Sequence, residues 1–160
     1  MPSGTTPSRS IRHARPDDAE RIAAIVEQAY TPWIAVVGRR PRPMDDDYVA
    51  RCAKGHCWLL EDDGRPLGVV IIEDMDGYLF LHNIAVAPEV QHRGLGRLLM
   101  RFVEDEARRR SYGEVKLTTT VVMQRNVDLY LRLGYAITGR EPTATVDRLW
   151  MTKHMHADGT

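Results

Sequence analysis

Apolar side chains recur along the chain with two different periods, which separate its strands from its helices. The segment 78–86 is apolar on both faces apart from two residues, and this pattern predicts a central strand buried in a sheet. The two exceptions, His82 and Asn83, are either hydrogen-bonded core residues or residues of a site. Two apolar runs at 57–61 and 67–75 precede this strand, and the turn residues between them predict an antiparallel hairpin.

Helices are predicted where apolar residues repeat at intervals of three and four. Such a face begins directly after Gly94 and is expected to end near Tyr112 and Gly113. Asp17 and Glu20 have the spacing of a capping box, so a first helix is expected at about 17–30. The remaining expected elements are strands at 10–14, 115–123, 135–138 and 146–153, a short helix at 46–53 and a helix at 124–133.

The order of these elements defines the fold class. Strand, helix, helix, three strands, helix, strand, helix and two strands form an α/β chain with a mixed sheet. With 160 residues, of which 43% are hydrophobic, the chain can bury one core and is short for two. We therefore expect one domain at 9–155, between flexible tails at 1–8 and 156–160.

Composition narrows the set of partners. The chain has 22 Lys and Arg against 22 Asp and Glu, so no overall positive field attracts nucleic acid or an anionic membrane, and neither is expected as a partner. No apolar run approaches the roughly 20 residues that span a bilayer, and the polar start lacks the apolar core of a signal peptide. A cytoplasmic location is the expectation.

The two cysteines raise the question of a metal or a disulfide. Cys52 and Cys57 flank His56. Two thiols and one His fall short of a four-ligand zinc set and lack its usual spacing, so no metal is expected.

A glycine-containing loop follows the central strand and is the strongest chemical signal in the chain. Gly94 and Gly96 let the backbone approach a ligand closely, and the free amides of the helix that starts there would bind an anion such as a phosphate. Arg93 and Arg97 add positive charge or are solvated surface residues. A Rossmann loop would need a third glycine at Leu99, and an NTPase loop would need Gly-Lys-Ser/Thr, so neither pattern is met.

The stretch 31–47 mixes Trp33 and Met44 with three prolines and three arginines. Its prolines and Gly38 are incompatible with a plain helix. It is expected to be either a shaped loop that lines a pocket or an ordinary connection between helices.

Two motifs of the chain belong together. One is Gln91-His-Arg-Gly94-Leu-Gly96, after a strand that ends at Val86-Ala-Pro88, and the other is Leu129-Tyr130-Leu-Arg-Leu-Gly134-Tyr135. They resemble the two motifs of the GNAT superfamily of N-acetyltransferases: the acyl-CoA loop, Arg/Gln-x-x-Gly-x-Gly/Ala, and the second motif, Leu-Tyr-x-x-x-Gly-Phe/Tyr. The likeness covers about 10–155. One departure is Met123, where the family often has Asn; here Asn126 lies one helical turn before Tyr130.

The resemblance implies a single-domain GNAT-like fold with a mixed, mostly antiparallel sheet of about seven strands and about four helices. It also implies acetyl-CoA as co-substrate. Backbone groups of the strand end would pair with the pantetheine arm, the loop amides and arginines would hold the pyrophosphate, and the second motif would complete the site. The residues to which the resemblance assigns cofactor binding are Ile84, Ala85, Val86, Gln91, His92, Arg93, Gly94, Leu95, Gly96, Arg97, Asn126 and Tyr130.

The implied activity is transfer of an acetyl group to a primary amine by direct attack in a ternary complex. Tyr130 would protonate the departing thiolate, or is a packing tyrosine. His82 is the first candidate for the general base and Glu73 the second; in the alternative, His82 is structural and bulk water takes the proton. Trp33, Arg39 and Arg40 are candidate contacts for the acceptor, whose identity the sequence leaves open. A homodimer is also considered. The alternative function is a non-catalytic acyl-CoA-binding sensor.

Overall fold

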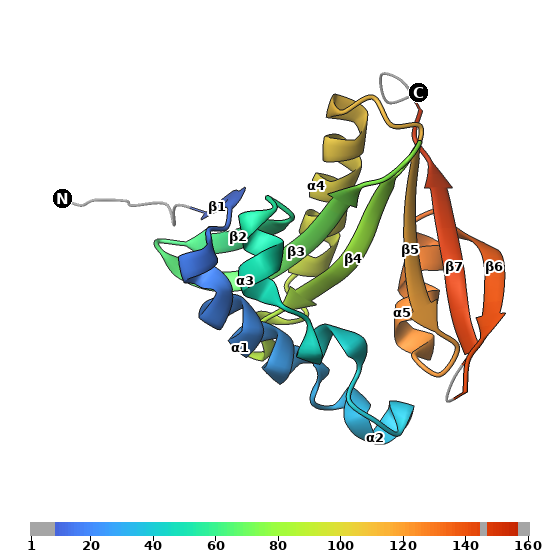
Figure 1. The fold of residues 1–160 in the computed structure, drawn as a ribbon, viewed down its shortest axis with the longest axis horizontal. Helices are drawn as coiled ribbons and strands as arrows, with labels where there is room; N and C mark the ends of the chain where they lie inside the picture. The colour runs from blue at the N-terminus through green and yellow to red at the C-terminus, as the bar shows by residue number, and fades with distance from the viewer. Residues whose placement is uncertain (1–8, 145–146, 157–160) are drawn as a thin grey trace.

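A computed structural model of the chain describes residues 9–144 and 147–156 (Figure 1). It contains one seven-stranded sheet in the order β1-β2-β3-β4-β5-β7-β6. Only β4 and β5 are parallel, and every other neighbouring pair is antiparallel. The strands are β1 (Arg9–His13), β2 (Cys57–Asp62), β3 (Arg65–Asp74), β4 (Leu79–Val86), β5 (Glu114–Thr120), β6 (Ala136–Pro142) and β7 (Asp147–His154). The predicted α/β class and mixed, mostly antiparallel sheet are confirmed.

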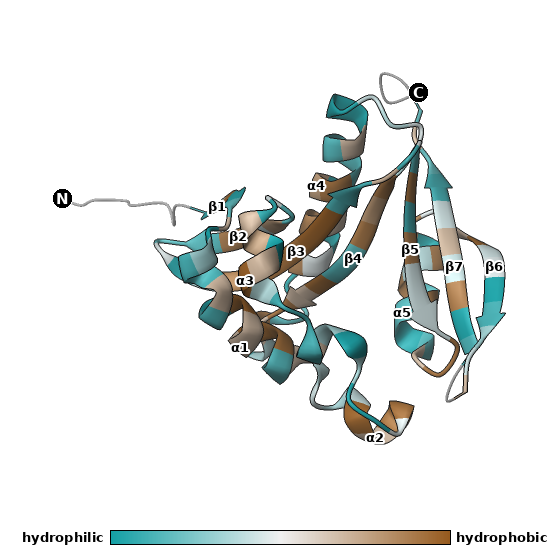
Figure 2. Cartoon of the chain, viewed as in Figure 1, coloured by the Kyte–Doolittle hydropathy of each residue, from teal (hydrophilic) through white to brown (hydrophobic). Residues whose placement is uncertain are grey.

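Helices cover both faces of the sheet. In residues 9–144 and 147–156 the α-helices are α1 (Ala19–Tyr30), α2 (Trp33–Val37), α3 (Tyr48–Ala53), α4 (Leu95–Arg109) and α5 (Gln124–Arg132). On one face α4 packs on β3, β4 and β5, and α5 packs on β5. On the other face α1 and α3 cover β2, β3 and β4 with a second apolar core (Figure 1). Figure 2 shows that apolar residues are concentrated along β3 and β4, between these two layers.

Several boundaries differ from the expectation. The described residues form five α-helices instead of about four, because residues 33–37 of the proline-rich stretch form α2 before Gly38 ends it in the left-handed conformation. The capping box predicted for Asp17 and Glu20 is wrong. Pro16 begins a 3-10 turn, Pro16–Asp18, and Asp18 instead accepts the backbone amide of Arg15 at 2.8 Å. Helix α4 ends at Arg109, three residues before the expected end. The tails expected at 1–8 and 156–160 lie outside the described residues, apart from His156.

The feature that positions the site is the parallel pair β4 and β5. They pair only over Leu79–Leu81 and Val115–Leu117, although both strands continue further. Figure 1 shows the two strands diverging beyond this point. The register of β4 against β3 also shifts, so that Ile72 pairs with Leu81 and Ile71 with Asn83, and His82 is the extra residue of a β-bulge. A bulge re-aims the side chain that it contains, and here it lies beside the opening between the strands.

Candidate active site

A pocket of about 760 Å³ occupies the opening between β4 and β5. One wall comes from β4 and from the segment between α1 and α3, and the opposite wall comes from β5, α5 and β7. Its lining residues include Arg39, Arg40, Arg42, Asp45, Asp46, Arg51, Phe80, His82, Asn83, Ile84, Thr118, Thr119, Thr120, Asn126, Tyr130 and Arg148. Pockets that bind small ligands have volumes in this range.

The second half of β4 has a free edge in the pocket. Within the described part of the chain no strand pairs with β4 on its β5 side beyond Leu81, whereas on the other side Ala85 still pairs with Val69 of β3. Ile84 and Val86 are half-buried and Ala85 is buried. Unpaired strand groups beside a pocket can accept an extended ligand as an additional strand.

The glycine loop lies between β4 and the N-terminus of α4. Gly94 is left-handed with φ 79°, and His92 is also left-handed with φ 68°. Among the described residues no acceptor is found for the backbone amides of His92, Arg93 and Gly94, and the first-turn amides of α4 have no partner within the helix. A Cβ atom at Gly94 or Gly96 would meet no atom within 4 Å. The loop is therefore open and rich in donors, which suits an anion.

Other loop side chains have separate roles. Arg93 and Arg97 are exposed, while Leu95 is buried in the core and offers only its backbone amide to a ligand. The Gln91 side chain donates a hydrogen bond from Nε2 to the Val86 carbonyl at 3.2 Å. This contact ties the loop to the end of β4.

Helix α5 brings Tyr130 into the pocket wall, and Asn126 lies there one turn earlier. Tyr130 is 8% exposed, and its ring meets the edge of Tyr135 at a centroid distance of 6.0 Å. Burial raises the pKa of Tyr130 to about 12, so its hydroxyl stays protonated at neutral pH. A neutral phenol in this position can donate a hydrogen bond or a proton.

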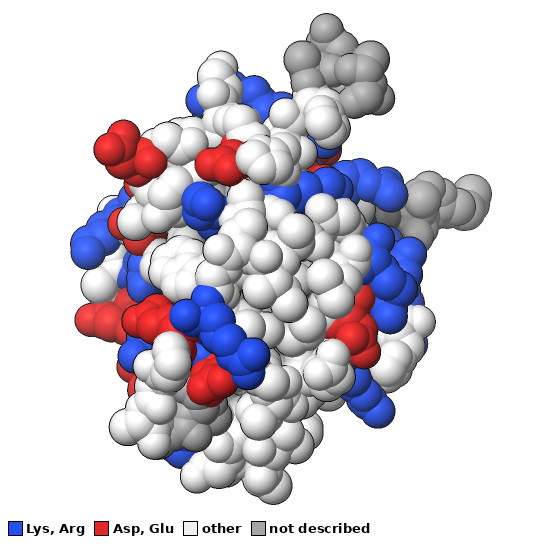
Figure 3. Space-filling model, turned by 90° about the vertical axis from the view of Figure 1, so that its right-hand side faces the viewer, with Lys and Arg blue, Asp and Glu red and all other residues white. Residues whose placement is uncertain are grey.

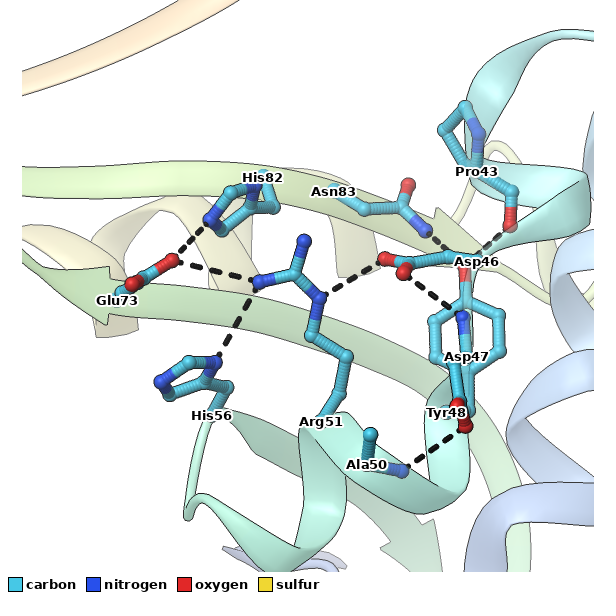
Figure 4. Close-up of polar contacts among 10 residues, drawn as sticks. All are labelled: Pro43, Asp46, Asp47, Tyr48, Ala50, Arg51, His56, Glu73, His82 and Asn83. Carbon is cyan, nitrogen blue, oxygen red and sulfur yellow. Dashed lines mark hydrogen bonds and ion pairs between the residues drawn. The ribbon is translucent and has the colours of Figure 1, made fainter.

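The two candidate bases form one unit. Nε2 of His82 lies 2.7 Å from Oε1 of Glu73, which reaches it from the neighbouring strand β3 (Figure 4). Burial lowers the pKa of His82, and the hydrogen bond to Glu73 opposes that effect. The same hydrogen bond lowers the pKa of Glu73. His82 is thus neutral at neutral pH beside an ionised carboxylate.

Arg51 of α3 completes this polar group and was not recognised from the sequence. Its guanidinium lies 3.4 Å from Glu73 and 3.0 Å from Asp46, and 3.5 Å from Nδ1 of His56 (Figure 4). No feature of the sequence distinguished Arg51 from an ordinary arginine on a helix surface. Its partners come from β3, the segment before α3 and the connection between α3 and β2, which only the fold brings together.

Asn83 is a satisfied core residue. Its side-chain oxygen accepts a hydrogen bond from the Tyr30 hydroxyl at 2.7 Å, and its amide donates to the Tyr48 hydroxyl at 3.2 Å. The Tyr48 hydroxyl in turn donates to the Pro43 carbonyl. Asn83 therefore ties α1, α3 and the segment before α3 to the central strand, and so fixes one wall of the pocket.

The three predicted acceptor contacts are placed differently. Arg39 and Arg40 line the pocket, but Trp33 is half-buried in α2 and is not among the lining residues. Arg40 forms ion pairs with Glu27 and Asp45, each at 3.0 Å. Its charge is therefore already compensated.

The cysteines form no disulfide. Cys52 and Cys57 are buried free thiols, and burial raises the pKa of each. Within 9–144 and 147–156 no group of three or more His, Cys, Asp or Glu could hold a metal ion.

The helices and the charged surface are relevant to a membrane or a nucleic acid as a partner. None of the described helices is long and apolar enough to cross a membrane. Figure 3 shows acidic and basic side chains interspersed around a broad uncharged area, without a large field of one sign on that face.

The diverging parallel pair and the donor-rich loop define the class of site: a pocket for an extended ligand with an anionic group. Residues 14–135 match the model of the Acetyltransferase (GNAT) family. The chain belongs to this family.

Individual relatives agree with this assignment. L-amino acid N-acyltransferase MnaT of Escherichia coli is 30% identical in an alignment of 144 residues that covers 83% of each chain. N-acetyltransferase 8B of Mus musculus is 28% identical over 115 residues, 59% of this chain and 50% of the relative, so the chain spans about half the length of that mouse protein. PaiA N-acetyltransferase of Thermoplasma acidophilum, solved in complex with coenzyme A, has the same fold with a TM-score of 0.76, 14% identity, and coverage of 92% of this chain and 99% of its own.

Proposed function

We propose that the protein is an acetyl-CoA-dependent N-acetyltransferase that acetylates a primary amine by direct attack in a ternary complex. One observation carries the proposal: β4 loses its parallel partner after Leu81, next to a loop in which the amides of His92, Arg93 and Gly94 have no acceptor among the described residues. An extended thioester ligand with a pyrophosphate needs both features. Membership of an acetyltransferase family and the coenzyme A complex of the Thermoplasma relative support this use of the site.

For the cofactor, the backbone of Ile84, Ala85 and Val86 would pair with the pantetheine arm along the free edge of β4. The amides from His92 to Gly96 would hold the pyrophosphate, whereas the Gln91 amide already donates to the Pro88 carbonyl at 3.3 Å. Arg93 and Arg97 would add charge from the surface. The open space in front of Gly94 and Gly96 supports this assignment. Asn126 is proposed as an additional contact from α5.

Tyr130 is proposed as the donor to the departing thiolate. Its raised pKa keeps the hydroxyl protonated throughout the physiological range. A free thiol has a pKa of about 8.5, so proton transfer from Tyr130 to a free thiolate would be unfavourable. The CoA thiol would lie in the same buried surroundings and would also have a raised pKa, which lowers the cost of this transfer. Tyr130 would stabilise the developing charge by a hydrogen bond and then pass on the proton.

His82 is proposed as the base, with Glu73 as its positioning residue. Because the Glu73 carboxylate can only accept, the neutral imidazole carries its proton on Nε2 and keeps its lone pair on Nδ1. An alkyl ammonium with a pKa of about 10 must lose a proton before it attacks, and Nδ1 would receive it. Glu73 would then stabilise the imidazolium, and Arg51 would keep Glu73 ionised.

No covalent enzyme intermediate is proposed. The raised pKa values of Cys52 and Cys57 leave little thiolate, which supports direct attack. The name of the Escherichia coli relative supports an amino acid as one class of acceptor. Trp33 would act on the acceptor only through the packing of α2. The cytoplasmic location and the homodimer stay predictions.

The proposal is tested by mixing the protein with acetyl-CoA and a panel of primary amines, and by following release of free thiol and the mass of the acceptor. Thiol release that depends on the amine, with one acetyl group added to it, is the expected result. Binding of acetyl-CoA without release for any amine would identify a sensor.

A further inference from the structure

The walls of the pocket carry more positive than negative charge. Five arginines line it, whereas only two carboxylates do. The carboxylates are both engaged: Asp45 pairs with Arg40, and Asp46 pairs with Arg51. The remaining arginines are Arg39, Arg42 and Arg148. Among the described residues none of these three forms an ion pair with a carboxylate.

Arg148 is the most firmly positioned of the three. It is half-buried on β7, and its guanidinium lies 5.8 Å from the centre of the Trp150 ring. Trp150 contacts Phe80 at a centroid distance of 5.7 Å, and Phe80 meets His82 at 4.6 Å. A chain of aromatic contacts thus connects Arg148 to the proposed base. A side chain held in this way loses less conformational freedom when it binds a ligand.

A polar side chain beside Arg148 has an unused hydrogen-bonding group. Thr120 pairs with Arg148 across the β5–β7 register, so both side chains lie on the same face of the sheet. The buried Thr120 hydroxyl has no hydrogen-bond partner in the described part of the chain. Buried polar atoms normally have a partner, so an unsatisfied hydroxyl lies on the same face as Arg148 at this end of the pocket.

We propose that Arg148 binds a carboxylate of the acceptor, so that the substrate is a small amine that also carries a carboxylate. This inference rests on the proposed function, since it concerns the acceptor of the same reaction. The amine would lie towards His82. The carboxylate would lie towards Arg148, whose guanidinium is held in place. Arg39, which is exposed on the opposite wall and directly follows Gly38, would add a second, weaker contact. Guanidinium groups match carboxylates geometrically, which gives specificity as well as affinity.

The test compares amino acids with the amines that remain when their carboxylate is removed. Suitable pairs are L-leucine with 3-methylbutylamine and L-phenylalanine with 2-phenylethylamine; 4-aminobutyrate with propylamine tests a longer spacing between amine and carboxylate. The wild type should have a higher kcat/KM for the carboxylate-bearing member of at least one pair. Preference for an α-amino acid or for 4-aminobutyrate then identifies the spacing.

The variants are Arg148→Gln, Arg148→Lys and Arg39→Gln, with Arg109→Gln on the exposed end of α4 as the matched control. Losing a charge-assisted hydrogen bond worth about 1.5–3 kcal/mol should raise KM for the preferred amino acid about 10- to 100-fold in Arg148→Gln. KM for the matching amine should change less than about twofold, Arg148→Lys should recover part of the loss, and Arg109→Gln should behave as wild type.

Two results would overturn the inference. In one, the wild type prefers the amines that lack a carboxylate. In the other, Arg148→Gln raises KM equally for both members of a pair, as a structural role would. If no amine is acetylated, calorimetric binding of the same pairs to the CoA-loaded protein decides separately: carboxylate-dependent binding that Arg148→Gln abolishes supports the inference although the proposed function has failed, and its absence refutes both.

Discussion

The pair formed by His82 and Glu73 gives the most discriminating prediction about mechanism. Removal of a general base costs about 10²- to 10⁴-fold, so His82→Gln should lower kcat/KM by that factor, or about 3–5 kcal/mol in the barrier. Glu73→Gln should cost far less. It replaces a charge-assisted hydrogen bond, about 1.5–3 kcal/mol at the observed 2.7 Å, by a neutral one of about 0.5–1.5 kcal/mol. The difference, about 1–1.5 kcal/mol, corresponds to roughly a tenfold loss of kcat/KM.

The pH dependence of kcat/KM should shift in a defined direction in each variant. Because burial lowers the pKa of His82, the acidic limb of kcat/KM should lie below the ordinary His pKa of about 6.5. Glu73 raises the pKa of His82, so Glu73→Gln should move the limb to lower pH. Arg51 lowers it, so Arg51→Gln should move the limb to higher pH. The two variants should therefore shift the acidic limb in opposite directions, although Glu73 and Arg51 are paired with each other.

The assay is the pH profile of kcat/KM between about pH 5 and 9, with the acceptor below KM and acetyl-CoA saturating. His82→Gln should lose the acidic limb and recover partly at high pH, where more of the amine is already neutral. An unaltered limb in His82→Gln, combined with its loss in Glu73→Gln, would assign the base to Glu73. If neither variant alters the limb, bulk water accepts the proton and the reasoning about this pair is refuted.

Three further predictions concern separate parts of the molecule. Tyr130→Phe should lower turnover about 10²- to 10⁴-fold with little change in calorimetric CoA affinity, and wild-type turnover would leave Tyr130 with a packing role. Gly96→Val should abolish CoA binding and leave the thermal midpoint unchanged, because a side chain there meets no protein atom; Gly113→Val, which is equally open but outside the site, should bind CoA normally. The hydrogen bond from Arg12 lowers the pKa of Asp18 from 3.8 to about 2. At most about 2 kcal/mol of the free energy of unfolding should therefore be lost as the pH falls from 4 to 2. Urea unfolding measures this loss, and Asp18→Asn should not show it.

Local sequence patterns predicted most of the fold. The apolar runs predicted β2, β3 and β4 to within a few residues, and the three- and four-residue period predicted α4. Helix α2 was not predicted, because the prolines around it indicated a loop. The pattern did not show that Glu104 of α4 is buried and pairs with Lys153 of β7 at 3.0 Å. A pattern along one helix does not reveal a partner that lies 49 positions away.

The site likewise has a part that the sequence predicted and a part that it did not. The glycine loop and Tyr130 lie in contiguous motifs, so the sequence was sufficient to nominate them. The bulge at His82 depends on the register between β3 and β4, and no local signal distinguishes it. The roles of Arg51 and Arg148 depend on which strands and helices meet across the pocket. For the same reason the compensation of Arg40 by Glu27 could not be anticipated.

The most direct test of the account is a crystal structure of the protein grown with CoA. The pantetheine arm should lie between β4 and β5 and pair with the backbone of Ile84–Val86. The pyrophosphate should rest on the amides before α4, with the sulfur within hydrogen-bonding reach of the Tyr130 hydroxyl. CoA bound elsewhere, or a sulfur atom facing away from both Tyr130 and His82, would contradict the proposed site and the mechanism built on it.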